Sequence, residues 1–226
     1  ANLLAVIIGL IYFDCFSHTL RFQQFSFRLA VIRQTAVNGI SEMVTELSVG
    51  ITTYLFNLII FAWAGESGIA ALSIILYIEM LLTSAYIGFM EGTAPILSYN
   101  YGAKSDTQLK HLVKLSLLWI TCASLVTFVL SHLLASSLVH LFLPIENSTY
   151  TLTLQGLRLF SLSFLLCGFN IFDTGFFTAI SHGRTAAICS FARNLACIVF
   201  FLWLLPKFIG LAGIWLAVPA ADLCAV

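Results

Sequence analysis

Residues 68–92 read GIAALSIILYIEMLLTSAYIGFMEG, and this apolar run decides the fold class. A helix needs about 20 mainly apolar residues to cross the hydrocarbon core of a bilayer, and this run exceeds that length. Apart from Glu91 near its end, its one charged residue is Glu79, near the middle. The run therefore predicts a membrane-spanning α-helix rather than the core of a water-soluble domain.

Similar runs occur along the whole chain. Hydrophobic residues make up 60% of the sequence and charged residues 9%, whereas about a quarter of an ordinary soluble domain is charged. We expect an all-α membrane protein, a polytopic transmembrane helix bundle whose surroundings are the lipid bilayer. The other expected spans are 36–63, 112–136, 153–180 and 186–206, with parts of spans at 1–13 and 210–226. Because both ends fall inside apolar runs, we expect a fragment of a longer chain.

The composition also excludes several functions. The net charge is zero, so the basic surface that a nucleic-acid partner requires is lacking. The six cysteines show neither CxxC nor His-pair spacing, which predicts no metal site and no disulfide framework. We find no GxSxG-like turn and no aspartate cluster for a magnesium diphosphate, so an intramembrane enzyme is not expected. No cofactor is predicted.

Charges in the loops predict the orientation of the spans. Residues 14–34, DCFSHTLRFQQFSFRLAVIRQ, mix arginines with aromatic residues and read as an amphipathic connector at the membrane interface. Cytoplasmic loops retain Lys and Arg, and alternate connections here carry them. This pattern predicts a multi-pass protein with segment 14–34 in the cytoplasm, followed by a transmembrane lobe at 35–226. The basic residues on the inner side are Arg21, Arg28, Arg33, Lys104, Lys110, Lys114 and Arg184, against Glu66, Glu146 and Lys207 outside.

Charged groups at bilayer depth each cost about 2.5–3.5 kcal/mol on insertion scales, so each one requires a reason. On a helix of about 100° per residue, Glu42, Glu46, Thr53 and Asn57 fall within about 60° and form one polar stripe. Glu42 and Glu46 are one turn apart and repel each other, so the pair is a candidate for holding a proton or a cation. Snorkelling to the interface or helix-to-helix contact remains the alternative.

Two further polar stripes occur on later spans. Glu79, Thr83 and Tyr86 gather on one face of the second span, and Ser163, Asn170, Asp173 and Thr174 gather on one face of the fourth. Stripes that face a shared cavity would form an acidic, water-accessible pocket. Arg193 is either a counter-ion to one of the acids or a clamp between helices.

Helix-breaking and aromatic residues complete the pattern. Gly88, Gly92 and Pro95 are expected to weaken the end of the second span, and interrupted helices are where transporters expose backbone groups to cargo or ions. A plain helix terminus is the alternative. Aromatic residues flank Asp173 and suit an amphiphilic cation through their ring faces. These are Phe172, Phe176 and Phe177.

Four segments resemble the C-terminal lobe of the multidrug and toxic compound extrusion (MATE) family, especially its bacterial members. They are NGISEMVTELSVGITTYLFN at 38–57, GTAPILSYNYGAK at 92–104, GFNIFDTGFFTAISHGR at 168–184 and GLAGIWLAVPAAD at 210–222. The second segment is the most specific and contains Gly92, Pro95, Asn100, Tyr101 and Gly102. The resemblance covers essentially the whole chain and implies one six-helix lobe of a two-lobe transporter, whose N-terminal lobe would be its partner.

The resemblance implies an antiporter of the cell (inner) membrane. Such a protein exports small organic cations and amphiphilic xenobiotics in exchange for protons or sodium ions. Acidic residues on the seventh and tenth family helices would serve ion coupling, and these match Glu46, with Glu42 as a second candidate, and Asp173. A sodium ion at Glu46 and Asp173 is one expectation. The alternative is an exporter of lipid-linked oligosaccharides or polysaccharides of the same superfamily, in which basic residues would hold phosphates.

Overall fold

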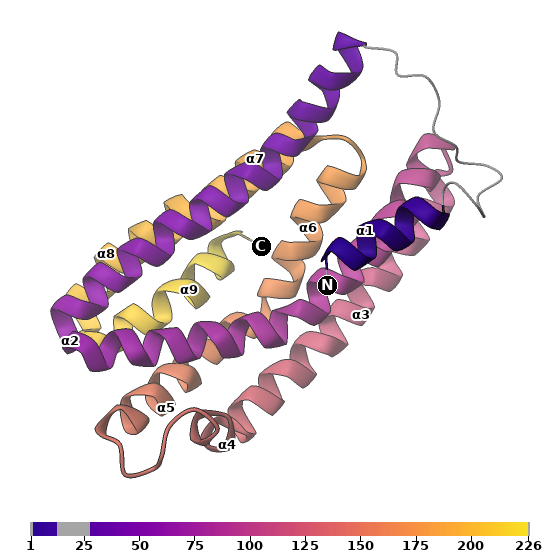
Figure 1. Cartoon of the computed structure of the whole chain (residues 1–226). Helices are drawn as coiled ribbons and strands as arrows, with labels where there is room; N and C mark the ends of the chain where they lie inside the picture. The colour runs from indigo at the N-terminus through magenta and orange to yellow at the C-terminus, as the bar shows by residue number, and fades with distance from the viewer. Residues whose placement is uncertain (1, 13–27, 226) are drawn as a thin grey trace. The chain divides into compact units, whose positions relative to one another are not determined.

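The computed structural model describes residues 2–12 and 28–225, and every regular element in these ranges is helical (Figure 1). The chain divides into two compact units, Ala1–Thr35 and Ala36–Val226. The first contains α1 (Asn2–Ile11) and the first turns of α2 (Leu29–Gly102). Of the expected connector at 14–34, residues 14–27 lie outside the described residues and 29–34 belong to α2. The helix bundle lies in the second unit.

α2 contains two spans joined at a corner, visible in Figure 1. Its arms meet at Gly65, whose φ of 61° and ψ of −149° interrupt the helix. This conformation lies near a region that is essentially restricted to glycine, because a Cβ would clash with the backbone. The arms correspond to the predicted spans 36–63 and 68–92.

The second arm extends further than predicted. The expected weakening at Gly88, Gly92 and Pro95 is wrong, because α2 stays helical through them to Gly102. A proline removes one backbone hydrogen bond, and transmembrane helices tolerate this loss because neighbouring groups satisfy the freed carbonyl. The loop before the next helix is therefore only 103–105.

The third and fourth predicted spans are each divided. α3 (Asp106–Leu133) is followed by the short α4 (Ala135–His140). The expected single span at 153–180 is a bent pair, in which α5 and η2 together make an angle of 44° with α6. The bend follows a 3-10 segment, whose tighter turn changes the direction of the chain. The elements are α5 (Ser148–Phe160), η2 (Ser161–Leu165) and α6 (Cys167–Ala179).

The final part of the chain is a helical hairpin. Its first side is continuous from Gly183 to Ile209 and contains the predicted span 186–206. Its second side, α9 (Leu211–Ala225), begins after Gly210, which has a φ of 62°. The first side comprises α7 (Gly183–Phe191), the π-helical η3 (Ala192–Cys197) and α8 (Ile198–Ile209).

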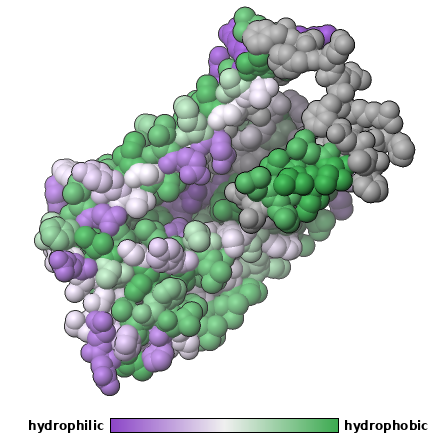
Figure 2. Space-filling model, viewed as in Figure 1, coloured by the Kyte–Doolittle hydropathy of each residue, from purple (hydrophilic) through white to green (hydrophobic). Residues whose placement is uncertain are grey.

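Glycine allows close packing in this hairpin. A Cβ at Gly213 would lie 2.4 Å from the Leu205 carbonyl carbon and 2.6 Å from the Pro206 nitrogen, so only glycine lets α9 approach α8 this closely. Trp215 and Phe160, each 1% exposed, fill the core between α9 and α5. Large hydrophobic residues remain exposed along the helices, and hydrophobic residues cover much of the face in Figure 2. Such a surface suits contact with lipid.

Candidate functional site

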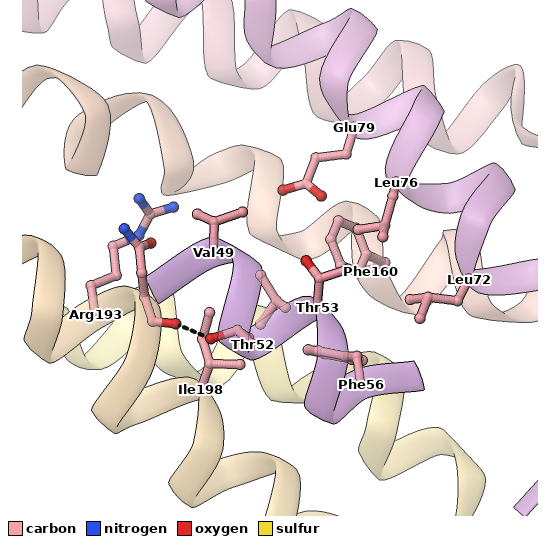
Figure 3. Close-up of a pocket in the computed structure, with 12 residues that line it drawn as sticks. Val49, Thr52, Thr53, Phe56, Leu72, Leu76, Glu79, Phe160, Arg193 and Ile198 are labelled. Carbon is pink, nitrogen blue, oxygen red and sulfur yellow. Dashed lines mark hydrogen bonds between the residues drawn. The ribbon is translucent and has the colours of Figure 1, made fainter. Parts of the chain in front are cut away.

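A cavity of about 560 Å³, a volume that includes space open to the surroundings, lies between both arms of α2 and elements η3, α5, α8 and α9 (Figure 3). Ligand cavities of this size, about 300–1,000 Å³, are typically apolar with a few polar groups. The cavity follows this pattern. Its polar lining residues are Thr52, Thr53, Glu79, Arg193 and Asn194, and its apolar ones are Val49, Phe56, Leu72, Leu76, Phe160, Ile198 and Val218.

The π-helix η3 positions one side of the cavity. Thr52, buried on the first arm of α2, donates a hydrogen bond of 2.6 Å to the backbone carbonyl of Asn194 (Figure 3). π-helical turns widen the backbone, change its hydrogen-bond pattern and recur at functional sites. The bond between these distant segments ties the first arm of α2 to η3, and η3 also carries Arg193.

Arg193 forms a buried ion pair with Asp222 of α9. The Arg193 Nε lies 2.7 Å from Asp222 Oδ1, and the same oxygen accepts a hydrogen bond of 3.2 Å from Asn170 Nδ2 of α6. Asp222 is 0% exposed, and its Oδ2 has no hydrogen-bond partner in the described part of the chain. The cluster joins three helices, so Arg193 is both a counter-ion and a clamp.

Glu79 reaches the cavity from the second arm of α2. In Figure 3 its carboxylate and the Arg193 guanidinium lie on opposite sides of the cavity. Glu79 interacts electrostatically with both Arg193 and Asp222, yet Arg193 makes its ion pair within 4.0 Å only with Asp222 among the described side chains. The cavity region therefore holds one cation and two carboxylates.

Asp173 lies elsewhere, in a second and more open groove between α3 and α6. This groove has a volume of about 790 Å³, again including open space, and aromatic rings dominate its lining. The rings of Phe172 and Phe176 are 6.2 Å apart and stacked, and those of Phe176 and Phe177 are 5.7 Å apart and edge to face. The remaining lining residues are Phe169, Asn170, Val113, Leu117 and Ala225.

The structure distributes the other predicted polar residues over several environments. Glu42 and Glu46 are exposed on the first arm of α2, and neither lines the polar cavity or the Asp173 groove. Asn57 donates to the backbone carbonyl of Thr53, one turn before it, at 2.8 Å. Tyr86, 2% exposed, donates to Thr127 of α3 at 3.0 Å instead of facing the cavity.

Residues of the segment at 92–104 connect the ends of two helices. Ser98 donates a hydrogen bond of 2.8 Å to the Ala179 carbonyl at the end of α6, and the Tyr101 ring lies 6.3 Å from that of His182. Asn100 is buried, and its amide bonds to the Ile96 carbonyl at 2.9 Å. Gly92 and Pro95 are exposed on α2, which ends at Gly102.

Sequence reasoning singled out Thr53, Glu79 and Arg193, which line one cavity in the structure, but it did not single out Asp222, Thr52 or Asn194. Asp222 carries the same signal as Glu79, since both are carboxylates inside apolar runs. The Thr52 and Asn194 contacts have no such signal, because a backbone carbonyl acceptor leaves no mark in the sequence.

A comparison with protein-family models identifies one family, and comparisons with solved structures show the same fold. The family model described as MatE matches residues 42–203. A MATE protein in complex with MaL6 and an outward-facing multidrug resistance MATE transporter of the MOP superfamily both superpose with a TM-score of 0.90 at 18% identity. A MOP superfamily transporter from Pyrococcus furiosus Vc1 (DSM3638) gives the same values. A comparison with curated proteins found no match.

Each of these structures is matched over 99% of this chain but only 51% of its own length. The chain therefore spans about half the length of the solved transporters that it resembles. The fold likeness confirms the predicted membrane helix bundle, and the family model covers most of the bundle. The chain belongs to the MatE family of multi-pass membrane transporters.

Proposed function

We propose that the complete transporter is a secondary active antiporter that exports cationic or amphiphilic organic compounds in exchange for protons or sodium ions. The observation that carries this proposal is the groove around Asp173, in which a carboxylate lies among four phenylalanine rings. A cation over an aromatic ring gains about 0.5–2 kcal/mol, and a carboxylate in a low-dielectric groove attracts the same charge. The groove therefore suits an organic cation with an apolar body.

Coupling is assigned to Glu46, with Glu42 as the second candidate, and to Asp173, as the family resemblance implies. Binding of a proton or a sodium ion at these carboxylates would neutralise them and release a cation held by their charge. In such a transporter the binding site opens alternately to the two sides of the membrane. A coupling ion shifts the equilibrium between these two states only by the difference in its affinity for them. The plasma membrane is the proposed location. The proposed process is transport, without chemical catalysis.

An exporter of lipid-linked oligosaccharides or polysaccharides is the weaker proposal. Its cargo would require basic groups free to hold phosphates. Arg193, the basic residue of the cavity, is paired with Asp222. For the Pyrococcus furiosus relative, reverse polarity of the binding pocket suggests a different function, so pocket polarity is the property to compare. Here the carboxylates outnumber the cation, which favours a cationic cargo.

The test uses the full-length protein in proteoliposomes, with efflux of a fluorescent organic cation driven by a proton or sodium gradient. Glu46→Gln and Asp173→Asn should each abolish gradient-driven efflux, because an amide can neither release a proton nor attract a cation as a carboxylate does. Glu146→Gln, in an exposed loop, is the matched control and should transport normally. Undiminished efflux by both site variants would refute the assignment.

A further inference from the structure

The polar cavity holds charges that do not balance. The charged or titratable groups that face or interact with Glu79 are Arg193 from η3, Asp222 from α9 and the Cys167 thiol from α6. Among the described residues, the polar groups that the first arm of α2 adds to the lining are the hydroxyls of Thr52 and Thr53. With both carboxylates ionised, one cation and two anions leave a net charge of −1. An uncompensated charge at this depth is costly, and one bound positive charge removes it.

A proton fits this cavity better than a metal ion. Among the described residues, Glu79 is the one carboxylate in the lining; Asp222 does not line the cavity, and its Oδ1 already bonds to Arg193 and Asn170. Among the described residues, no group of three or more His, Cys, Asp or Glu side chains is arranged to hold a metal ion. The guanidinium of Arg193 would also repel a metal ion at short range.

The ion pair of Arg193 leaves room for a second arrangement. Arg193 contacts Asp222 through Nε, and Asp222 Oδ2 is buried without a hydrogen-bond partner in the described structure. A guanidinium commonly holds a carboxylate through two parallel hydrogen bonds, so this pair is incomplete. The side chain of Arg193 is 18% exposed and lines the cavity that Glu79 enters from the other side.

We propose that Glu79 is a proton-binding site of this lobe and that its ionisation sets the partner of Arg193. Neutral Glu79 leaves Arg193 on Asp222, which links η3 to α9. Ionised Glu79 attracts Arg193, which weakens that link and connects η3 to the second arm of α2. Proton binding thereby shifts the equilibrium between two packings of the same helices. Its role in transport rests on the proposed antiport, whereas proton binding itself does not.

Proton uptake by the full-length protein in detergent, without cargo, tests the site directly. Acidification should load about one proton fewer per protein in Glu79→Gln than in the wild type. The acid-minus-alkaline infrared spectrum should lose one neutral-carboxyl C=O component in the same variant. Glu91→Gln, an exposed glutamate on the same arm of α2, is the matched control and should retain that component. Glu79→Asp keeps a carboxyl group and should also retain it.

Proton uptake and infrared spectra of Glu79→Gln identical to those of Glu91→Gln would overturn the proton site. In proteoliposomes, the pH profile of efflux by Glu79→Gln should lose one titration step relative to the wild type, and a profile equal to the wild type would overturn the switch of Arg193. Failure of the antiport proposal would give a different combination of transport and proton-loading results. In that case Glu46→Gln and Asp173→Asn transport normally, while proton loading at Glu79 is unaffected.

Discussion

Asp222 is a carboxylate that the protein retains at full burial, and two contacts to one of its oxygens define its environment. The Arg193 guanidinium neutralises it, the Asn170 amide bonds the same oxygen, and the second oxygen has no hydrogen-bond partner among the described residues. An ion pair in a low-dielectric interior adds little net stability when both partners are present. Removing one partner leaves an uncompensated buried charge and is strongly destabilising.

At this residue scale we expect Asp222→Asn, measured at a pH where Glu79 is neutral, to lower the free energy of unfolding by about 3 kcal/mol, because Arg193 then lacks a counter-ion. Thermal unfolding of the full-length protein in detergent provides the measurement. Glu66→Gln, exposed beside the Gly65 corner, should change stability by less than about 0.5 kcal/mol. The double variant Asp222→Asn with Arg193→Gln should lose less than the sum of the two single variants, and strict additivity would contradict the pairing.

At the scale of helices, two glycines with nearly equal backbone angles end neighbouring spans. Gly65 has φ 61° and ψ −149°, and Gly210 has φ 62° and ψ −141°. A Cβ built on Gly210 would lie 3.9 Å from the Trp63 ring, so the two corners are adjacent in the fold. The first arm of α2 and α8 therefore end on the same side of the lobe.

Gly65→Ala should destabilise the protein by about 1–3 kcal/mol, through backbone strain rather than through a clash. Beyond its chain neighbours, no atom of the described residues lies within 4 Å of the added Cβ, so the cost comes from the positive φ. Gly92→Ala is the control, since Gly92 is helical in the same α2 and its Cβ would also meet open space. Alanine favours a helix, so equal destabilisation of both variants in a thermal assay would argue against strain at the corner.

At the scale of the whole molecule, the loop charges predict the orientation in the membrane. Loop 103–105 should be cytoplasmic because it contains Lys104 and is followed by Lys110 and Lys114, and the loop containing Glu146 should face outward. A membrane-impermeant maleimide should label Glu146→Cys in intact cells and Ala103→Cys only after permeabilisation. Both variants need a background without the native cysteines. The reverse labelling pattern would contradict the assigned orientation.

Much of this lobe could be predicted from its sequence, because hydropathy is a local property. A helix in lipid must satisfy its backbone hydrogen bonds internally, so each long apolar run becomes a span whatever its neighbours are. The structure confirms helices over the five expected spans. The predicted boundaries were less accurate. α2 continues through Pro95, and the run at 153–180 is bent, since neighbouring helices rather than residue preferences decide such features.

The candidate site depended on contacts that no local pattern records. The burial cost of a charge singled out Glu79 and Arg193 from sequence, and the same argument applies to Asp222. Contacts at the site join residues that are far apart in the chain. Asn170 lies 52 residues from its partner Asp222, and Thr52 lies 142 residues from its partner Asn194. The sequence alone determined that this chain spans a membrane and keeps charges there. Only the tertiary structure decided which charges meet, because helix rotation and packing, not spacing, bring them together.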